Sequence, residues 1–471
     1  MTALLPFKIY NTLTRQLEDF KLADAATRAR RGYDIGLYLC GITPYGLTHV
    51  GNARTMIVFD TFVCFLRAAG YKVKFVRNFT DIDDKIIKRA NDENRSAESV
   101  STEFIQAFRE DMAGLNVLPA DAEPLVSQTL PEITTHIQRL LDRGHAYQAP
   151  NGDVLYEVAT FKNYGKLANR KLDEQQAGAR VEVEPGKKHP FDFVLWKQAK
   201  PGEPSWASPW GAGRPGWHIE CSAMSCKHLH GDTETFDIHG GGMDLQFPHH
   251  ECEIAQSEGA YDHTYVNHWM HVAFVNMAGE KMSKSLGNIM TVREALQKFD
   301  GRAIRLNMLM THYRSPVDFS EESIRQAEAA LQRIDAALAR AKGELMIVEE
   351  ITSYVRPLPE LLAKPLLNDF NTAEFLGHVF GLVKELNGDK ASLEVLGHLV
   401  SALEVMGMLP KTWPQLFNDD LSPELKNLLS CIDTARQAKD YVTADALKTQ
   451  LQTEFGGKIT ITPAGAKWSK N

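Results

Sequence analysis

The chain has no long hydrophobic run, and this absence sets the first limit on its function. No stretch of its 471 residues approaches the roughly 18 consecutive apolar residues that a membrane-spanning helix needs. Residues 1–20 also lack the charged segment followed by an apolar run that marks a secretory signal. We therefore expect a cytoplasmic protein with no membrane partner.

Cysteine is scarce as well. The six cysteines are irregularly spaced in a large chain, which argues against a disulfide framework and leaves free thiols or metal ligands. A net charge of -8 and a pI near 6.1 do not indicate a nucleic-acid binder, although local patches rather than totals decide such binding. The cysteines are Cys40, Cys64, Cys221, Cys226, Cys252 and Cys431.

The sequence does contain alternating strand and helix patterns. Residues 35–42 are apolar and end in a Gly/Pro turn, residues 48–70 carry apolar residues at helical spacing, and residues 71–80 again favour a strand. This order predicts the opening of a parallel α/β sheet. Residues 152–216 read as an insertion that begins with strands, the chain after residue 318 reads as a helical bundle, and the end reads as a helix followed by a hairpin.

Two segments have the composition of a nucleotide site. After the first strand, His49 and Asn52 lie one helical turn apart, and Gly51 lets the backbone approach a phosphate at the helix N-terminus. The alternative is that both residues only cap the helix. Residues 276–288, NMAGEKMSKSLGN, hold two lysines among small residues, typical either of a solvated turn or of a loop that closes on a triphosphate. Residues 237–244 form a glycine turn after another predicted strand.

The motifs resemble those of a known family. HVGN (49–52) and KMSKS (281–285) resemble the two signatures of class I aminoacyl-tRNA synthetases. With YLCGITPYGLTHVGNART, RNFTDIDDKIIKRA, PGWHIECSAM and FDIHGGGMDLQFPHHECEIAQS, in this order, the chain resembles bacterial cysteinyl-tRNA synthetases over nearly its whole length. The family usually has His where this chain has Asn52, and Asn where it has Cys252.

The resemblance implies an architecture. It comprises a Rossmann-like parallel-sheet catalytic domain with an inserted connective segment, then a helical bundle and a small mixed α/β C-terminal domain. We expect the catalytic domain at 1–128 and 217–275, the insertion at 129–216, a KMSKS-bearing linker domain at 276–317, the bundle at 318–411 and an anticodon-binding domain at 412–471.

The resemblance also implies residue roles. The catalytic residues it implies are His49, Asn52, Lys281 and Lys284. The ATP-binding residues it implies are His49, Gly51, Asn52, His239, Gly241, Asp244 and Lys284. The cysteine substrate is expected against Gly41, Thr43, Thr80 and Trp217.

A metal site is the third expectation. From spacing alone, the candidate metal ligands are Cys40, Cys221, His249, His250, Cys252 and Glu253. Spacing does not show whether Cys252 or Glu253 is the ligand. A buried cysteine cluster without metal is the alternative. The resemblance implies one zinc per chain, held by Cys40, Cys221, His249 and Glu253. Zinc favours a thiolate over an alcohol, which suits an enzyme that must reject serine.

The implied reaction has two steps. ATP, with Mg²⁺, activates L-cysteine as an adenylate with release of pyrophosphate, and cysteine tRNA then accepts the cysteinyl group on its terminal ribose with release of AMP. A monomer is expected. One alternative is a ligase that transfers cysteine to an amino sugar, and the C-terminal tail argues against it. A second is a non-catalytic RNA-binding paralogue, which the intact KMSKS and the intact zinc ligands argue against. A third is a plain nucleotidyltransferase, which would not need the helical bundle. The acidic segment TDIDDK (80–85) favours a helix N-cap over a metal-dependent phosphoryl site.

Overall fold

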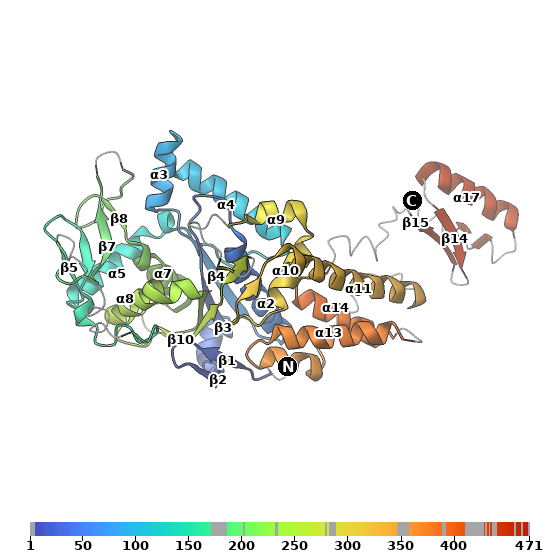
Figure 1. The fold of residues 1–471 in the computed structure, drawn as a ribbon, viewed down its shortest axis with the longest axis horizontal. Coiled ribbons are helices and arrows are strands. Elements are labelled where there is room, and N and C mark those ends of the chain that lie inside the picture. The colour runs from blue at the N-terminus through green and yellow to red at the C-terminus, as the bar shows by residue number, and fades with distance from the viewer. Residues whose placement is uncertain are drawn as a thin grey trace. The chain divides into compact units, whose positions relative to one another are not determined.

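The computed structural model of the chain describes most of its length (Figure 1). The described residues are 5–170, 186–200, 203–230, 234–277, 280–281, 289–345, 358–388 and 392–409, with 428, 431–432, 434–435, 440–455, 458–462 and 465–469 toward the end. Residues 1–332, 357–380 and 402–408 form one compact unit, and residues 333–356, 381–401 and 409–471 form a second. The six-part domain division stays a prediction.

A parallel sheet lies at the centre of the first unit. Its strand order is β10 (Val266–Val272), β9 (Phe236–Gly242), β3 (Ile35–Ile42), β4 (Val73–Phe79), and every pairing is parallel. Strand β3 is almost wholly buried, as expected for a central strand covered on both faces. The predicted Rossmann-like sheet is confirmed. Because the strands run parallel, their carboxyl ends lie at one edge.

Helices cover both faces of this sheet. In Figure 1, α7 (Trp217–Ser225) and α8 (Glu251–Tyr261) lie to one side of it, and α2 (Val50–Ala68) and α10 (Gly301–Leu309) to the other. Helix α2 packs so closely on β9 that a Cβ at Gly240 would lie 2.1 Å from the Phe59 ring. Glycine at this position therefore sets the distance between helix and strand.

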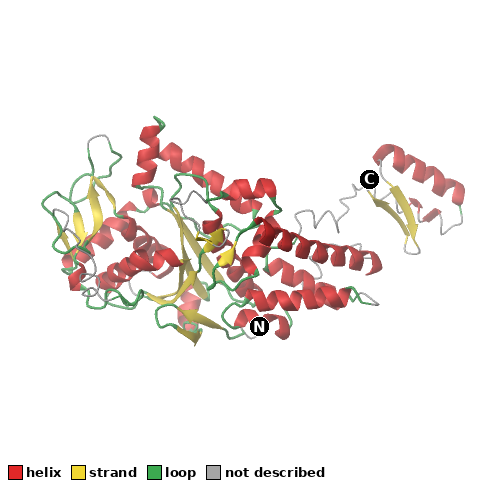
Figure 2. Cartoon of the chain, in the orientation of Figure 1, coloured by secondary structure: helices red, strands yellow, loops and turns green. Residues whose placement is uncertain are grey.

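The remaining elements of the first unit extend this core (Figure 2). The insertion forms an antiparallel sheet in the order β5-β6-β7-β8, and β12-β11-β13 form a small mixed sheet. The N-terminal hairpin β1-β2 is not among the predicted elements. The bounds are β1 Lys8–Asn11, β2 Gln16–Asp19, α1 Ala25–Arg31, α3 Asp84–Asp92, α4 Ala97–Gly114, α5 Leu130–Asp142, β5 Ala146–Gln148, β6 Val154–Tyr156, β7 Phe193–Gln198, β8 Gly213–Pro215, β11 Val275–Met277, β12 Glu280–Lys281, α9 Val292–Lys298, β13 Val317–Asp318 and α12 Glu360–Leu367.

Helices dominate the chain after residue 318, as predicted. They are α11 (Glu321–Leu345), α13 (Thr372–Leu386), α14 (Leu393–Val405) and, near the end, α17 (Tyr441–Phe455). The predicted terminal hairpin is present as the antiparallel strands β14 (Lys458–Thr462) and β15 (Gly465–Ser469). Within the described residues, none of these or the other helices combines the length and the apolar character that crossing a bilayer requires.

A buried arginine holds α2 in place. Arg305, on α10, is fully buried and donates hydrogen bonds to the carboxylate of Asp60 and the hydroxyl of Thr61, both on α2. It also donates to the carbonyl oxygens of Asn116, at 3.0 Å, and of Met406. A buried guanidinium with this many acceptors is satisfied, and it joins four segments of the first unit.

We expect Arg305→Met to destabilise the first unit by about 3–5 kcal/mol, because it leaves the Asp60 carboxylate buried without its cation. Hydrogen exchange measured by mass spectrometry should show faster exchange in α2 and α10. Arg325→Ala, which removes an exposed pair with Glu321, is the matched control and should change stability by less than about 1 kcal/mol. Equal effects of the two substitutions would contradict this role for Arg305.

Candidate active site and metal centre

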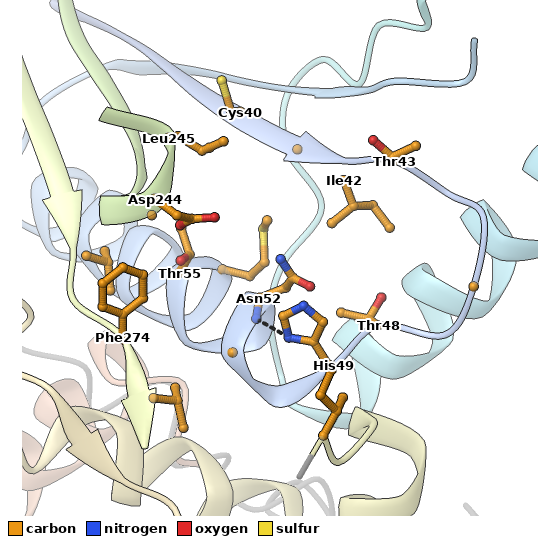
Figure 3. Close-up of a pocket in the computed structure, with 18 of the residues that line it drawn as sticks. Cys40, Ile42, Thr43, Thr48, His49, Asn52, Thr55, Asp244, Leu245 and Phe274 are labelled. Atoms are coloured by element: carbon orange, nitrogen blue, oxygen red, sulfur yellow. Dashed lines mark hydrogen bonds between the residues drawn. The ribbon is translucent and has the colours of Figure 1, made fainter. Parts of the chain in front are cut away.

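A cavity of about 570 Å³ opens at the carboxyl edge of the parallel sheet (Figure 3). Its walls come from the end of β3 with the following loop, the first turns of α2, the turn after β9 and the segment after β10, together with Lys85 on α3 and the residues just before α9. This is where open α/β sheets bind ligands. Among its lining residues are Cys40, Gly41, Thr43, His49, Gly51, Asn52, Asp244 and Phe274.

The N-terminus of α2 faces this cavity. His49 is the N-cap, and its Nδ1 accepts a hydrogen bond of 3.3 Å from the backbone N–H of Asn52 (Figure 3). The capping interpretation of His49 is therefore right, and it is compatible with ligand binding because His49, Gly51 and Asn52 all line the cavity. Among the described residues, none forms a hydrogen bond with the Asn52 side-chain amide, which leaves the amide available to a ligand.

The wall formed by β3 depends on a close backbone approach. A Cβ at Gly41 would lie 1.6 Å from the carbonyl oxygen of Asn78, so the position requires glycine. The Asn78 side chain in turn accepts from the Gly41 N–H at 2.9 Å. Thr43 lines the cavity, whereas Thr80 is buried behind it, with its N–H bound to the carbonyl oxygen of Ile42.

Of the residues expected to bind ATP at the end of β9 and in the turn after it, one lines the cavity and two do not. Asp244 lines the cavity, and its Oδ1 would lie 2.4 Å from a Cβ at Gly242, so a side chain there would displace this carboxylate. Gly241 and His239 are not among the residues that line the cavity. His239 is fully buried, and its Nε2 lies 2.9 Å from Oε2 of Glu253. The adenosine role expected for His239 stays a prediction, but the structure places this ring beside the acidic ligand candidate.

The four residues proposed as zinc ligands come together. Sγ of Cys40 lies 3.7 Å from both Sγ of Cys221 and Oε1 of Glu253, and Nε2 of His249 lies 3.1 Å from the same Oε1. The four donor atoms all lie within 4.8 Å of one another, and all four residues are buried. Two thiolates on one tetrahedral zinc, each about 2.3 Å from it, are about 3.8 Å apart. The donor set and its spacing therefore fit zinc.

Neighbouring groups orient these donors. His239 and the Tyr265 hydroxyl, at 3.1 Å, occupy Oε2 of Glu253, which leaves Oε1 toward the cluster. Nδ1 of His218 lies 2.9 Å from Nδ1 of His249, which leaves Nε2 of His249 toward Glu253. Such hydrogen bonds fix the orientation of metal ligands.

Trp217 lies against the cluster rather than in the cavity wall. Its ring stacks on that of His249, with centroids 4.4 Å apart and an interplanar angle of 24°. The side chain remains 43% exposed. Trp217 therefore covers a ligand candidate while keeping one face accessible, consistent with a role in shaping the substrate pocket.

Charge at the cluster also suits a cation. Burial raises the pKa of the Cys40 thiol well above its usual value, and Cys221 and Glu253 add to this effect. Burial lowers the pKa of His249 to about 3, so its imidazole is neutral, the form that binds metals. Burial alone would raise the pKa of Glu253, but the contact with His239 and the hydrogen bond from the Tyr265 hydroxyl hold it below its usual value. A divalent cation would stabilise the thiolate form of the cysteines.

A second group of four overlaps the first. Cys40, His239, His250 and Glu253 also bring their donor atoms within 4.8 Å. His250 contacts the Cys40 sulfur at 3.4 Å through Nε2, and its Nδ1 lies 2.8 Å from Nε2 of His271. Sequence reasoning gave His271 no role and did not name Tyr265, because both contacts depend on β10 lying beside β9.

The other cysteines considered as ligands lie elsewhere. Cys252 contacts the Tyr164 hydroxyl at 3.3 Å, and Cys226 contacts the Tyr261 hydroxyl at 3.4 Å. Neither belongs to a cluster with metal-ligand spacing among the described residues. Spacing left the choice between Cys252 and Glu253 open, and the contacts favour Glu253, whose carboxylate faces Cys40 and His249.

Two further motifs were expected near the site. In TDIDDK the N-cap interpretation is supported, since Asp83 is the N-cap of α3 and accepts from the Lys85 N–H at 2.8 Å. Lys281 ends the short strand β12. Lys284 lies outside the described residues, and so does the segment at 282–288 that was expected to close on ATP.

Comparison with known proteins places the chain among its relatives. Residues 27–329 match the family model for the class I (C) tRNA synthetase catalytic domain, and residues 364–409 match the DALR domain. The chain is 45% identical to a cysteine–tRNA ligase of Shewanella baltica (strain OS223), covering 98% of this chain and 99% of that one. It is 44% identical to the enzyme of Cronobacter sakazakii (strain ATCC BAA-894), with the same coverage.

Solved structures share the fold at low sequence identity. A Mycobacterium tuberculosis methionyl-tRNA synthetase in complex with methionyl-adenylate has a TM-score of 0.55 and 14% identity, covering 84% of this chain and 93% of that one. The leucyl-tRNA synthetase LeuRS of Agrobacterium radiobacter K84 has a TM-score of 0.56 and 10% identity, covering 81% and 84%. These structures show the fold alone. The family models and the full-length relatives show that the chain belongs to the cysteine–tRNA ligases, a family of class I aminoacyl-tRNA synthetases.

Proposed function

We propose that this protein ligates L-cysteine to cysteine tRNA in two steps, through a cysteinyl-adenylate, and that a zinc ion selects the cysteine thiol. One observation carries the proposal. Cys40 belongs both to the metal-binding group of four and to the lining of the cavity at the carboxyl edge of the sheet. A substrate side chain in the cavity therefore reaches the metal centre directly.

The cavity suits adenylate formation. The N-terminus of α2, with His49, Gly51 and Asn52, presents N–H groups and a positive helix dipole to phosphates. Asp244, which also lines the cavity, would accept hydrogen bonds from ribose hydroxyls. In-line attack of the cysteine carboxylate on the α-phosphorus of ATP needs alignment and charge stabilisation more than covalent help from the protein. Lys284 and Mg²⁺ would stabilise the departing pyrophosphate.

Selection against serine is assigned to the metal centre. Cys40, Cys221, His249 and Glu253 would hold zinc, which when bound supplies a soft Lewis acid that accepts a thiolate and discriminates against an alcohol. Gly41 and Thr43 line the cavity close to Cys40 in the chain, and the Trp217 ring stacks on that of His249. An apolar pocket alone separates such close analogues by only about 100-fold.

In the second step a terminal ribose hydroxyl of the tRNA attacks the activated acyl carbon and releases AMP. The C-terminal part, with α17 and the hairpin β14-β15, is assigned to the anticodon end of the tRNA. The protein is proposed to act as a cytoplasmic monomer.

Replacing Cys221 by Ser should remove bound zinc and weaken cysteine-dependent pyrophosphate exchange at least about tenfold, while ATP still binds. Metal content by atomic emission and exchange kinetics measure the two effects. Cys252→Asn is the matched control, since Cys252 contacts Tyr164 instead of the cluster. Full zinc content and normal exchange in the Cys221 variant would refute the ligand set, and zinc loss in the Cys252 variant would move a ligand there.

Lys284→Ala should slow adenylate formation by about 10²–10³-fold, because it removes a donor to charge that develops on the leaving group. The KM for cysteine should change by less than about threefold if the loop and the metal centre act separately. Steady-state pyrophosphate exchange with varied ATP and varied cysteine distinguishes these effects. Lys298→Ala, on the exposed end of α9, is the control. Equal damage to both parameters would show that the loop shapes the whole pocket.

A further inference from the structure

Lys85 is a cation at the mouth of the cavity that the roles above do not use. It is exposed, it belongs to the first turn of α3, and among the described residues it is the one Lys or Arg that lines the cavity. Its ammonium lies 5.3 Å from the centroid of the Tyr45 ring. A contact of this kind holds the ammonium by attraction to the aromatic face.

Among the described residues, nearby acids form no ion pair with this ammonium, although its charge opposes the rise that burial causes in the pKa of the Asp83 carboxyl. Asp83 accepts from the backbone N–H of Lys85 as the helix cap, and Asp84 is paired with Lys197, at 3.0 Å, and with Arg214. Within the described part of the chain, the Lys85 ammonium takes part in no ion pair. An unpaired cation beside a ligand cavity attracts anionic groups.

The loop beside Lys85 adds apolar surface. Leu47 lines the same mouth and is 42% exposed, and Tyr45 lines it too. The guanidinium of Arg89 donates to the Tyr45 carbonyl oxygen at 2.8 Å, which steadies this loop. An aromatic ring, an exposed aliphatic side chain and a cation together are typical of sites for single-stranded nucleic acid, where bases pack on apolar groups and phosphates meet the charge.

The position of this mouth separates it from the proposed ATP contacts. The ATP contacts lie on the first turns of α2 and on the turn at Asp244, whereas the mouth is formed by the loop at 45–47 and by α3. The ion pairs of Asp84 with Lys197 on β7 and Arg214 on β8 tie the start of α3 to the insertion. The mouth therefore lies where the insertion meets the catalytic core.

We propose that Tyr45, Leu47 and Lys85 form the subsite for the single-stranded 3′ end of the tRNA. Lys85 binds a backbone phosphate there, and Tyr45 and Leu47 contact a terminal base. This assignment rests on the proposed function and names the substrate segment that enters the cavity for the second step. Because ATP also carries phosphates, the test has to distinguish the two sources.

The first experiment compares the affinity of full-length cysteine tRNA with that of the same tRNA lacking its single-stranded 3′ nucleotides. Lys85→Ala should weaken binding of the full-length tRNA about three- to tenfold and leave binding of the shortened tRNA near the unmodified value. The slope of log affinity against log salt concentration should become shallower by about 0.7 for the full-length tRNA. Leu47→Ala should show the same dependence on the 3′ end without the change in slope.

The matched control is Lys88→Ala, on the same helix. Lys88 pairs with Asp92, is not among the lining residues, and should affect both tRNAs alike and little. Equal losses for both tRNAs in the Lys85 variant would overturn the proposal, since they would show general attraction instead of a 3′-end contact.

The second experiment separates the tRNA from ATP. Lys85→Ala should lower the single-turnover rate of cysteinyl transfer from preformed adenylate by more than it lowers pyrophosphate exchange without tRNA. A larger loss in exchange, with a raised KM for ATP, would assign the phosphate to ATP and overturn the tRNA subsite. Absence of cysteine-dependent exchange in the unmodified protein would instead refute the proposed function itself.

Discussion

A buried carboxylate governs the arrangement of this site. Glu253 is fully buried, and an ionised carboxylate without partners would be costly in such surroundings. Its two oxygens are divided: Oε2 binds His239 and Tyr265, and Oε1 faces Cys40 and His249. Strands β3 and β9, helix α8 and the start of β10 all have to be in place to provide these partners. The hydrogen bonds to Oε2 stabilise the buried carboxylate, and they leave Oε1 facing the other candidate metal ligands. One side chain thus contributes both to stability and to the candidate metal site.

The parallel sheet explains why these partners meet. The carboxyl ends of β3, β9 and β10 lie at one edge, so Cys40, His239 and His271 reach the same region although about 200 residues separate the first from the others along the chain. Helix α2 brings the phosphate-facing turn to that edge. Its position depends on two buried arginines: Arg305, described above, and Arg54, which donates to the carbonyl oxygens of Ala273 and Phe274 in the cavity wall.

The candidate metal site and the cavity are adjoining, because they share Cys40. In the proposed reaction, selection of the side chain and activation of the carboxylate would take place at the two ends of the same small substrate. The insertion contacts the core at the mouth of the cavity, where Asp84 on α3 forms ion pairs with it. Lys85, the next residue on α3, lies there against the Tyr45 ring. In the proposed reaction each partner would bind at a separate part of the cavity: the thiol at the metal site beside β3, ATP at α2, and the tRNA at the mouth.

Local sequence determined much of this protein. The apolar run at 35–42, the helical spacing after His49, the N-cap in TDIDDK and the terminal hairpin all form as predicted, because each depends on residues close in the chain. Motifs together with their family resemblance also named the four donors that the structure brings together. Tertiary structure alone decided which contacts each donor makes. In the folded chain His239 contacts Glu253, Cys252 contacts Tyr164, and Lys85 lies at the cavity mouth. These contacts join strands and helices that pack together only in the tertiary structure, so no local sequence pattern predicts them.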